Sequence, residues 1–299
     1  MKVNSNDIAI NYTVEGKGSW IVLSHSLACN YSMWDEQAGA LKQHYRVLRF
    51  DTRGHGGSDA PEGAYSLNML ADDLLGVLDS LGIEQTHFVG LSMGGMIGMT
   101  FALAHPGRFR SLVLCDTSSR IPSDAAPVWE GRIKTASEQG MEPLVEPTLQ
   151  RWFTEAFYKS NKAIMKRVGQ MIRTTKPAGY IGCCHAIPKI NLTDRLGAIS
   201  CPVQVIVGEQ DVGTPVAMSR AIQEAIPGSE LAIIPSASHL SNLEQPELFN
   251  KALLGFLQKH GSRQTIFARM VERLAKSRFF LGFCAAPLTP HSSRFPAGG

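Results

Sequence analysis

Short runs of hydrophobic residues alternate along this 299-residue chain with longer stretches in which hydrophobic residues recur at helical spacing. Several of the short runs are apolar at almost every position, which is typical of parallel strands buried on both faces. One of the longer stretches has leucines at helical spacing over 67–81 and ends at Gly82, a natural C-terminal cap. The alternation predicts an α/β fold, with a mostly parallel central sheet flanked by helices. The predicted strands are 8–14, 20–24, 45–50, 86–90, 111–115, 203–207 and 231–234.

The alternation breaks between Arg120 and Lys189, where strand-like runs are absent and helical stretches rich in Trp, Phe and charge take over. It resumes at Pro202 and ends in a predicted helix over 246–259, where Pro246 suits the first turn. We therefore expect a core over 1–119 and 190–262, an inserted helical cap over 120–189, and a C-terminal tail over 263–299. Basic charge and hydrophobic residues at helical spacing in the first half of the tail predict a basic amphipathic helix there, followed by disorder. It is either an extra packing helix, a nonfunctional extension, or a contact for a partner or membrane surface.

Composition agrees with a globular protein, since 44% of the residues are hydrophobic and the formal net charge is only +3. That small total gives no support to nucleic-acid binding. Resolved along the chain, however, the core carries −7, the cap +5 and the tail +5. The positive charge therefore belongs to the cap and the tail.

Cysteine spacing and the absence of long apolar runs exclude further classes of protein. The six cysteines fit neither a zinc site nor a small disulfide scaffold, so we expect reduced thiols and no metal. No run approaches the ~18 apolar residues of a membrane span. The polar segment 4–7 lacks the apolar stretch of a secretion signal, which favours a cytoplasmic protein.

The string Gly90-Leu91-Ser92-Met93-Gly94 follows a predicted strand and precedes an apolar helix over 96–104. A sharp strand-to-helix turn exposes a serine hydroxyl, and flanking glycines let neighbouring backbone approach it without a Cβ clash. We interpret Ser92 as a nucleophile; the alternative is an ordinary glycine-rich turn.

A serine nucleophile needs a histidine to accept its proton and an acid to orient that histidine. Asp211 and His239 each follow a predicted strand and occur in the expected order after Ser92. The rival acid is Asp116, at the end of strand 111–115. The remaining candidate histidines are interpreted as loop-fixing (His25, His55), surface or capping (His87, His105) and structural within the cap (His185).

Hydrolysis also requires two backbone N–H groups directed at the oxyanion of the tetrahedral intermediate. We assign them to Met93, which follows the nucleophile, and to Leu27, in the loop after strand 20–24. The glycine-rich loop 51–58 lacks the Gly-Lys-Ser/Thr of a phosphate loop and the spacing of a dinucleotide fingerprint, so it predicts no flavin or nicotinamide cofactor. We interpret it as a structural loop beside the site.

Over about residues 1–260 these motifs resemble the α/β-hydrolase superfamily, and within it most closely the 3-oxoadipate enol-lactonase family. The sequence departs from the family at Ala28 and Ser26, which stand where glycines are usual, and in the tail beyond about Gly261, which has no recognised counterpart. The distinctive strings are Trp129-x-x-Arg132, Arg151-Trp-Phe-Thr154, Gly179-Tyr-Ile-Gly-Cys-Cys184 and His239-Leu-Ser-Asn-Leu-Glu244. The resemblance implies a cofactor-free serine hydrolase that opens 3-oxoadipate enol-lactone in the β-ketoadipate pathway of aromatic catabolism.

That lactone carries a free carboxylate, which requires a cation or an array of N–H donors. Arg132 and Arg151 stand beside Trp129 and Trp152 in the basic cap, and we expect these four residues to bind the substrate. The alternative is that the arginines lie on solvated helix faces. Two other functions stay open: a broad carboxylesterase with perhydrolase side activity, and a ligand receptor on the same fold.

Overall fold

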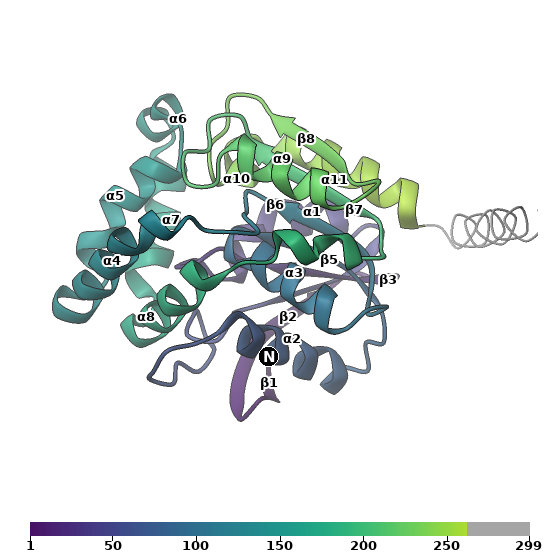
Figure 1. The fold of residues 1–299 in the computed structure, drawn as a ribbon, viewed down its shortest axis with the longest axis horizontal. Coiled ribbons are helices and arrows are strands. Elements are labelled where there is room, and N and C mark those ends of the chain that lie inside the picture. The colour runs from purple at the N-terminus through teal and green to yellow at the C-terminus, as the bar shows by residue number, and fades with distance from the viewer. Residues whose placement is uncertain (262–299) are drawn as a thin grey trace, which may run out of the picture. The chain divides into compact units, whose positions relative to one another are not determined.

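The computed structural model describes residues 1–261, and within them eight strands form one sheet in the order β1-β2-β4-β3-β5-β6-β7-β8. Strand β2 pairs antiparallel with both β1 and β4, and the other neighbours pair parallel. The predicted α/β class with a mostly parallel sheet is confirmed (Figure 1). The strands are β1 (Lys2–Ser5), β2 (Ile8–Glu15), β3 (Ser19–Ser24), β4 (Tyr45–Phe50), β5 (Thr86–Leu91), β6 (Phe109–Cys115), β7 (Val203–Gly208) and β8 (Glu230–Ile234).

All seven predicted strands are present, with their ends shifted by at most two residues. The central strands β5 and β7 are buried at every position, which explains why their sequences are mostly apolar. The edge strand β1 was not predicted, because Val3 is its only hydrophobic residue. It forms through backbone pairing with β2, in which Val3 stands opposite Ile10.

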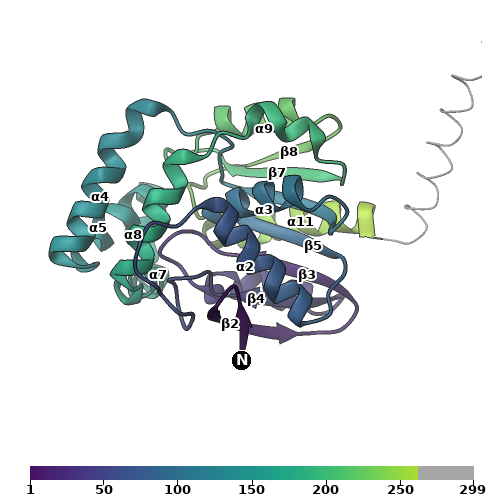
Figure 2. The same ribbon diagram turned by 60° about the horizontal axis from the view of Figure 1, so that its bottom comes forward.

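Helices cover both faces of the sheet. Helices α2 (Leu67–Ser80), α3 (Met93–Ala104) and α9 (Val216–Ala225) lie on one face, and Figure 2 shows them in front of the sheet. Helices α1 (Asp35–Leu41), α10 (Ser241–Glu244) and α11 (Pro246–Gly261) lie on the other. There the rings of Trp34 and Phe249 pack 6.1 Å apart, and the Gln37 amide donates to Asn250 Oδ1 at 3.1 Å.

Five helices stand between β6 and β7, in the region predicted as a cap, and lie at the left in Figure 1. Arg120 and Asn191 form an isolated antiparallel bridge, so the two ends of this insertion lie together. Residues Met1–Gln258 cluster as one compact unit that includes these helices. The predicted tail, 263–299, lies outside the described residues. The helices are α4 (Ala126–Gln139), α5 (Glu142–Trp152), α6 (Glu155–Ser160), α7 (Lys162–Thr174) and α8 (Pro177–Ala186).

The glycine-rich loop 51–58 fixes helix α8 to the sheet. A Cβ on Gly54 would lie 2.3 Å from the Cα of Gly179, so these two backbones can approach only because both residues are glycine. Lys176 Nζ donates to the carbonyl of Ser58 at 2.9 Å. The loop therefore has the structural role predicted for it.

Among residues 1–261, no helix combines the length and apolar character that crossing a bilayer would require.

Candidate active site

Ser92 lies in a tight turn between β5 and α3. Its backbone has φ +56° and ψ −115°, a conformation that few non-glycine residues adopt. Ser92 N donates to Cys115 O at 2.8 Å, and Thr117 Oγ1 donates to Ser92 O at 2.7 Å. A Cβ on Gly90 would lie 2.3 Å from Gly94 O, and one on Gly94 would lie 2.2 Å from Ser24 O. Both flanking glycines are therefore required by the packing.

We expect Gly94→Ala to lower the free energy of unfolding by about 3 kcal/mol, because the added methyl meets rigid backbone and overpacking of this kind costs ~1–3 kcal/mol or more. Urea unfolding monitored by circular dichroism would measure it. Gly131→Ala is the matched control: Gly131 lies in α4 with open space around its Cβ position, so alanine should raise stability by up to ~1 kcal/mol. An unchanged midpoint for Gly94→Ala would contradict the steric argument.

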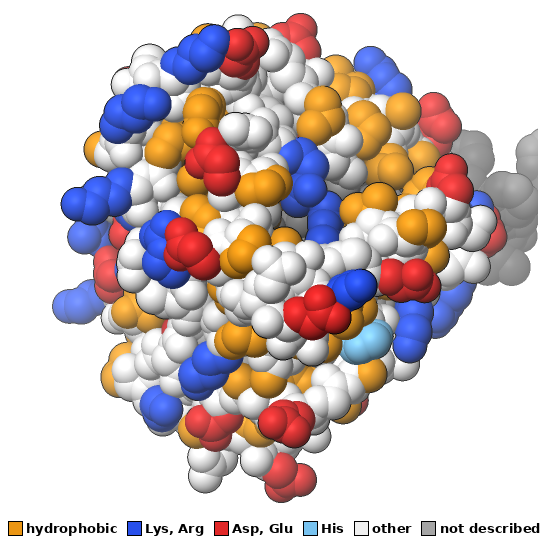
Figure 3. All heavy atoms as spheres, turned by 90° about the vertical axis from the view of Figure 1, so that its left-hand side faces the viewer, with side chains coloured by type: hydrophobic (Ala, Val, Ile, Leu, Met, Phe, Trp, Pro, Cys, Tyr) orange, Lys and Arg blue, Asp and Glu red, His pale blue; other side chains and the backbone are white. Residues whose placement is uncertain are grey.

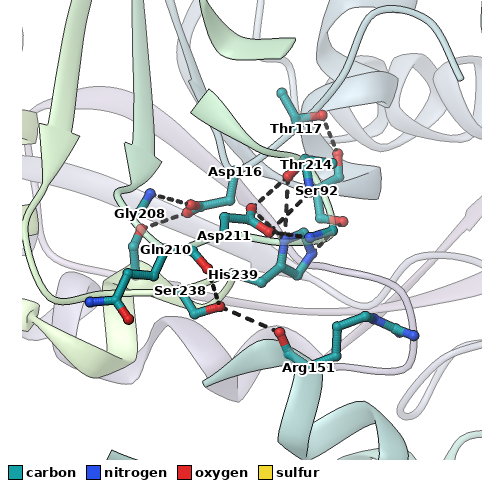
Figure 4. A network of polar contacts seen from close by, with 12 residues as sticks. Ser92, Asp116, Thr117, Arg151, Gly208, Gln210, Asp211, Thr214, Ser238 and His239 are labelled. Atoms are coloured by element: carbon teal, nitrogen blue, oxygen red, sulfur yellow. Dashed lines mark hydrogen bonds and ion pairs between the residues drawn. The ribbon is translucent and has the colours of Figure 1, made fainter. Parts of the chain in front are cut away.

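Ser92, His239 and Asp211 form one hydrogen-bonded chain (Figure 4). Ser92 Oγ lies 3.0 Å from His239 Nε2, and His239 Nδ1 lies 2.8 Å from Asp211 Oδ2. Burial alone would raise the pKa of the Asp211 carboxyl, but the charge of His239 and hydrogen bonds from His239 and Thr214 lower it to about 2. Ionised Asp211 can only accept, so Nδ1 carries the proton and Nε2 presents a lone pair to the Ser92 hydroxyl.

Asp211 is itself held by the turn that follows it. Its Oδ1 accepts from the backbone N of Gly213 at 2.7 Å and of Thr214 at 3.0 Å, and Thr214 Oγ1 donates to Oδ2 at 2.6 Å. These three donors fix the carboxylate while leaving Oδ2 directed at His239. Asp211 is therefore oriented independently of the histidine.

The rival acid Asp116 is fully buried, and both of its oxygens face other partners. Oδ1 accepts from Gly208 N at 2.7 Å and Oδ2 from Ser241 Oγ at 2.5 Å. Burial, together with the charge of Asp211, raises the pKa of this carboxyl well above its usual range. Asp116 ties the end of β7 to helix α10, and it is Asp211 that hydrogen-bonds His239.

The predicted loop-fixing histidines do connect two loops. His25 Nε2 accepts from Thr52 N at 2.9 Å, and His55 Nε2 accepts from Ala28 N at 3.0 Å. Burial lowers the pKa of His25 to about 4 and that of His55 to about 3, so both stay neutral and able to accept.

The interpretation of His87 as a surface or capping residue was wrong. His87 is buried on β5, with Nδ1 2.8 Å from Ser111 Oγ on β6. A central strand is covered on both faces, so a histidine on it becomes a core residue with a polar partner.

The loop after β3 presents Leu27 to the same cavity as Ser92. Among the described residues, the N–H groups of Ser26, Ala28 and Cys29 all donate to protein atoms, whereas that of Leu27 does not. Ala28, where glycine is usual, adopts φ +58°. The loop thus keeps a glycine-like backbone without glycine, and Leu27 and Met93, the first residue of α3, stay the predicted oxyanion donors.

A cavity of about 370 Å³ lies between the Ser92–His239 pair and the inserted helices. All four predicted substrate-binding residues line it: Trp129, Arg132, Arg151 and Trp152. The Trp152 ring packs 5.9 Å from the His239 ring, which places the end of α5 beside the histidine. Figure 3 shows the face of the molecule that carries the inserted helices. It has a hollow bordered by hydrophobic side chains and containing Lys or Arg side chains.

The two cavity arginines are close enough for the charge of Arg132 to act on Arg151. The guanidinium of Arg132 lies 4.5 Å from the Trp129 ring. Burial and the charge of Arg132 lower the pKa of Arg151 to about 10. Among residues 1–261, no carboxylate forms an ion pair with either one. Two neighbouring cations that form no ion pair favour an anionic ligand, although the charge of Asp211 also acts on Arg151.

Three residues of this region were given no role from the sequence, although Tyr180 and Glu244 lie in two of the strings that carry the resemblance. Thr148 and Tyr180 also line the cavity; the available signal for Thr148 was its position three residues before Arg151, on the same face of α5. Glu244 links the end of α5 to the histidine loop: it accepts from Thr154 N, from Thr154 Oγ1 and, at 3.0 Å, from Ser238 N.

Two features define the class of this protein. One is the strand order of the sheet, and the other is a serine in a strained strand-to-helix turn that is hydrogen-bonded to a histidine. The chain belongs to the α/β hydrolase family, whose sequence model, described as alpha/beta hydrolase fold, matches residues 19–246.

Within that family the chain is 35% identical to 3-oxoadipate enol-lactonase 2 of Acinetobacter baylyi, over 86% of this chain and 96% of the relative. The crystal structure of the enol-lactonase from Burkholderia xenovorans LB400 superposes with a TM-score of 0.84 at 37% identity, covering 86% and 100% of the two chains. A putative carbamate hydrolase, RutD of Agrobacterium fabrum, is 30% identical over 79% of this chain and 92% of its own. Since relatives with different names share the fold, the substrate must be argued from the cavity.

Proposed function

We propose that this protein is a cofactor-free serine hydrolase that opens 3-oxoadipate enol-lactone to 3-oxoadipate. The observation that carries the proposal is the pair Arg132 and Arg151, which form no ion pair with a carboxylate among the described residues and line the same cavity as Ser92 and His239. The enol-lactonase relatives support the same substrate. On this proposal the protein acts in the cytoplasm, in the β-ketoadipate pathway of aromatic catabolism.

The first half of the reaction is acylation of Ser92. His239 Nε2, 3.0 Å from Ser92 Oγ, accepts the hydroxyl proton as Oγ attacks the lactone carbonyl. The N–H groups of Leu27 and Met93 donate to the oxyanion. The ring oxygen leaves as an enolate, which His239 protonates, and the enol then relaxes to a ketone. An enolate is a better leaving group than an ordinary alkoxide, so this step suits a lactone of this kind.

The second half is hydrolysis of the acyl-enzyme. Water gives a proton to His239 and attacks the acyl carbon, and the proton returns to Ser92 as the bond to Oγ breaks. Ionised Asp211 stabilises the imidazolium that forms in both halves and keeps Nδ1 as a donor. Ser92, Asp211 and His239 are thus proposed as the catalytic residues.

The cavity provides an anchor for the free carboxylate of the lactone. Arg132 is held over Trp129, so its guanidinium is oriented before the ligand binds. Arg151 is half-buried, which strengthens its attraction for an anion relative to a fully solvated arginine. The surrounding apolar residues exclude water from the ring of the substrate.

Two assays on one preparation test the proposal. Loss of enol-lactone absorbance is compared with release of 4-nitrophenol from 4-nitrophenyl acetate, each with Ser92→Ala as control. The proposal expects kcat/KM for the lactone to exceed that for the ester. Rapid ester turnover without lactone turnover would favour the carboxylesterase alternative, and no turnover of either would favour a ligand receptor.

We expect Arg132→Ala to raise KM for the anionic lactone by about 10- to 100-fold, since a hydrogen bond to a charged group contributes ~1.5–3 kcal/mol. KM for a neutral ester should change far less, because such an ester has no carboxylate to bind. Arg173→Ala is the control: Arg173 is a cap arginine on α7 that is exposed and already paired with Glu142. Equal changes of KM for both substrates would contradict the carboxylate-binding role.

A further inference from the structure

The covalent intermediate of the proposed reaction is a six-carbon acyl chain with a carboxylate at its far end. When Ser92 opens the lactone ring, carbon 1 of the chain becomes the ester on Oγ, carbon 4 becomes the ketone, and carbon 6 is the carboxylate. A monoester of adipic acid would give an acyl-enzyme of the same length, in which carbon 4 is a methylene group. Both intermediates are hydrolysed by the same second step.

We infer that the site also hydrolyses linear monoesters of dicarboxylic acids, with monoalkyl adipates as the preferred chain length. This inference rests on the nucleophile and the carboxylate subsite of the proposed function, and it adds an open-chain substrate class. Its selectivity comes from Arg132 and Arg151: a carboxylate at the end of the chain binds them, whereas the methyl group of a neutral ester leaves both half-buried cations unpaired.

Hydrolysis of a linear ester releases a separate alcohol, and the cavity has exposed apolar residues along which that alcohol can leave. Two of its lining residues, Val128 of α4 and Val212 after β7, are 54% and 71% exposed and therefore lie at its mouth. With Met218, which also lines the cavity, they provide an apolar exit. A lactone keeps its leaving oxygen on the same molecule, so lactone hydrolysis alone does not need an exit for a separate alcohol.

The reaction balances without any co-reactant other than water. Ser92 Oγ attacks the ester carbon, its proton passes to His239, and the bond from that carbon to the alkoxy oxygen breaks as His239 protonates the departing alcohol. Water then cleaves the acyl-enzyme. The products are the alcohol and a dicarboxylate, with one proton released at neutral pH.

Proton release in a pH-stat provides the test, with monoethyl adipate and ethyl hexanoate as matched substrates of equal carbon-chain length in the acyl part. We expect kcat/KM for monoethyl adipate to exceed that for ethyl hexanoate by at least about tenfold, with a maximum at adipate across the monoethyl esters from succinate to suberate. In the double variant Arg132→Met, Arg151→Met this ratio should fall to about one. Arg173→Met should leave the ratio unchanged.

The enol-lactone assay runs in parallel and separates the two claims. Lactone turnover with an adipate-to-hexanoate ratio near one would overturn the inference and leave the proposed function standing. A high ratio without lactone turnover would support the inference and refute the proposed function. If neither ethyl ester is hydrolysed, or if the maximum falls at a diacid other than adipate, the assignment of monoalkyl adipates is overturned.

Discussion

Replacing Ser92 with alanine is expected to lower kcat for the enol-lactone by about 10⁴- to 10⁶-fold, as loss of the nucleophile does in other triad enzymes. The physical reason is that covalent catalysis ends with the loss of Oγ, which lies 3.0 Å from His239 Nε2. Alanine has the same Cβ as serine, so the strained turn at φ +56° keeps its geometry and its backbone hydrogen bonds.

Two measurements distinguish lost chemistry from lost structure. Loss of enol-lactone absorbance gives the rate, and calorimetric titration of Ser92→Ala with the lactone gives binding, which should stay within about tenfold of the wild-type KM. Ser80→Ala is the matched control, since Ser80 lies on the exposed end of α2 and does not line the cavity. Residual lactone turnover above one part in about 10³ would show that Ser92 is not the nucleophile.

The sheet could be predicted because its central strands are buried on both faces and are therefore mostly hydrophobic, with few polar interruptions such as His87 and Gln204. Strand β1 escaped prediction because its stability comes from backbone pairing with β2 instead of side-chain burial. The sequence placed His87 at the surface because its side chain is polar. In the structure Ser111, on the next strand, provides a hydrogen-bond partner for the His87 ring in the interior.

Residues of the candidate site could be predicted where they directly follow a strand of the sheet. Ser92, Asp211 and His239 follow β5, β7 and β8, and the carboxyl ends of parallel strands meet at one edge of the sheet. Glu244 could not be predicted in the same way. Its contact with Thr154 joins positions 90 residues apart, and no local pattern in the sequence specifies that pairing.

The cavity residues show an intermediate case. Trp129, Arg132, Arg151 and Trp152 were proposed from composition and resemblance, and all line the cavity. Tyr180 was missed because it comes from α8, and only the packing of α8 against α4 brings it to the arginines. Three helices converge on this cavity only in the tertiary structure.

The identity of the catalytic acid gives the second large expected effect: Asp211→Asn should lower kcat by about 10³- to 10⁴-fold, close to the loss seen on neutralising the acid of other triads. In the variant, the carboxamide oxygen can keep the contacts that Oδ1 makes with Gly213 N and Thr214 N, but the amide N–H would then be directed at His239 Nδ1. Nδ1 must then accept, so Nε2 carries the proton and cannot take one from Ser92.

Asp116→Asn is the matched substitution, because Asp116 follows β6 as Asp211 follows β7, is also buried, and touches Gly208 and Ser241 instead of His239. Burial raises the pKa of the Asp116 carboxyl well above its usual range, which lowers the cost of replacing it with a neutral amide. The carboxamide oxygen can keep accepting from Gly208 N, and its NH₂ group can donate to Ser241 Oγ, which now donates to Oδ2. We therefore expect kcat to change by less than about tenfold. Steady-state kinetics of both variants on the enol-lactone give the answer: a larger loss for Asp116→Asn than for Asp211→Asn would move the catalytic acid to the end of β6.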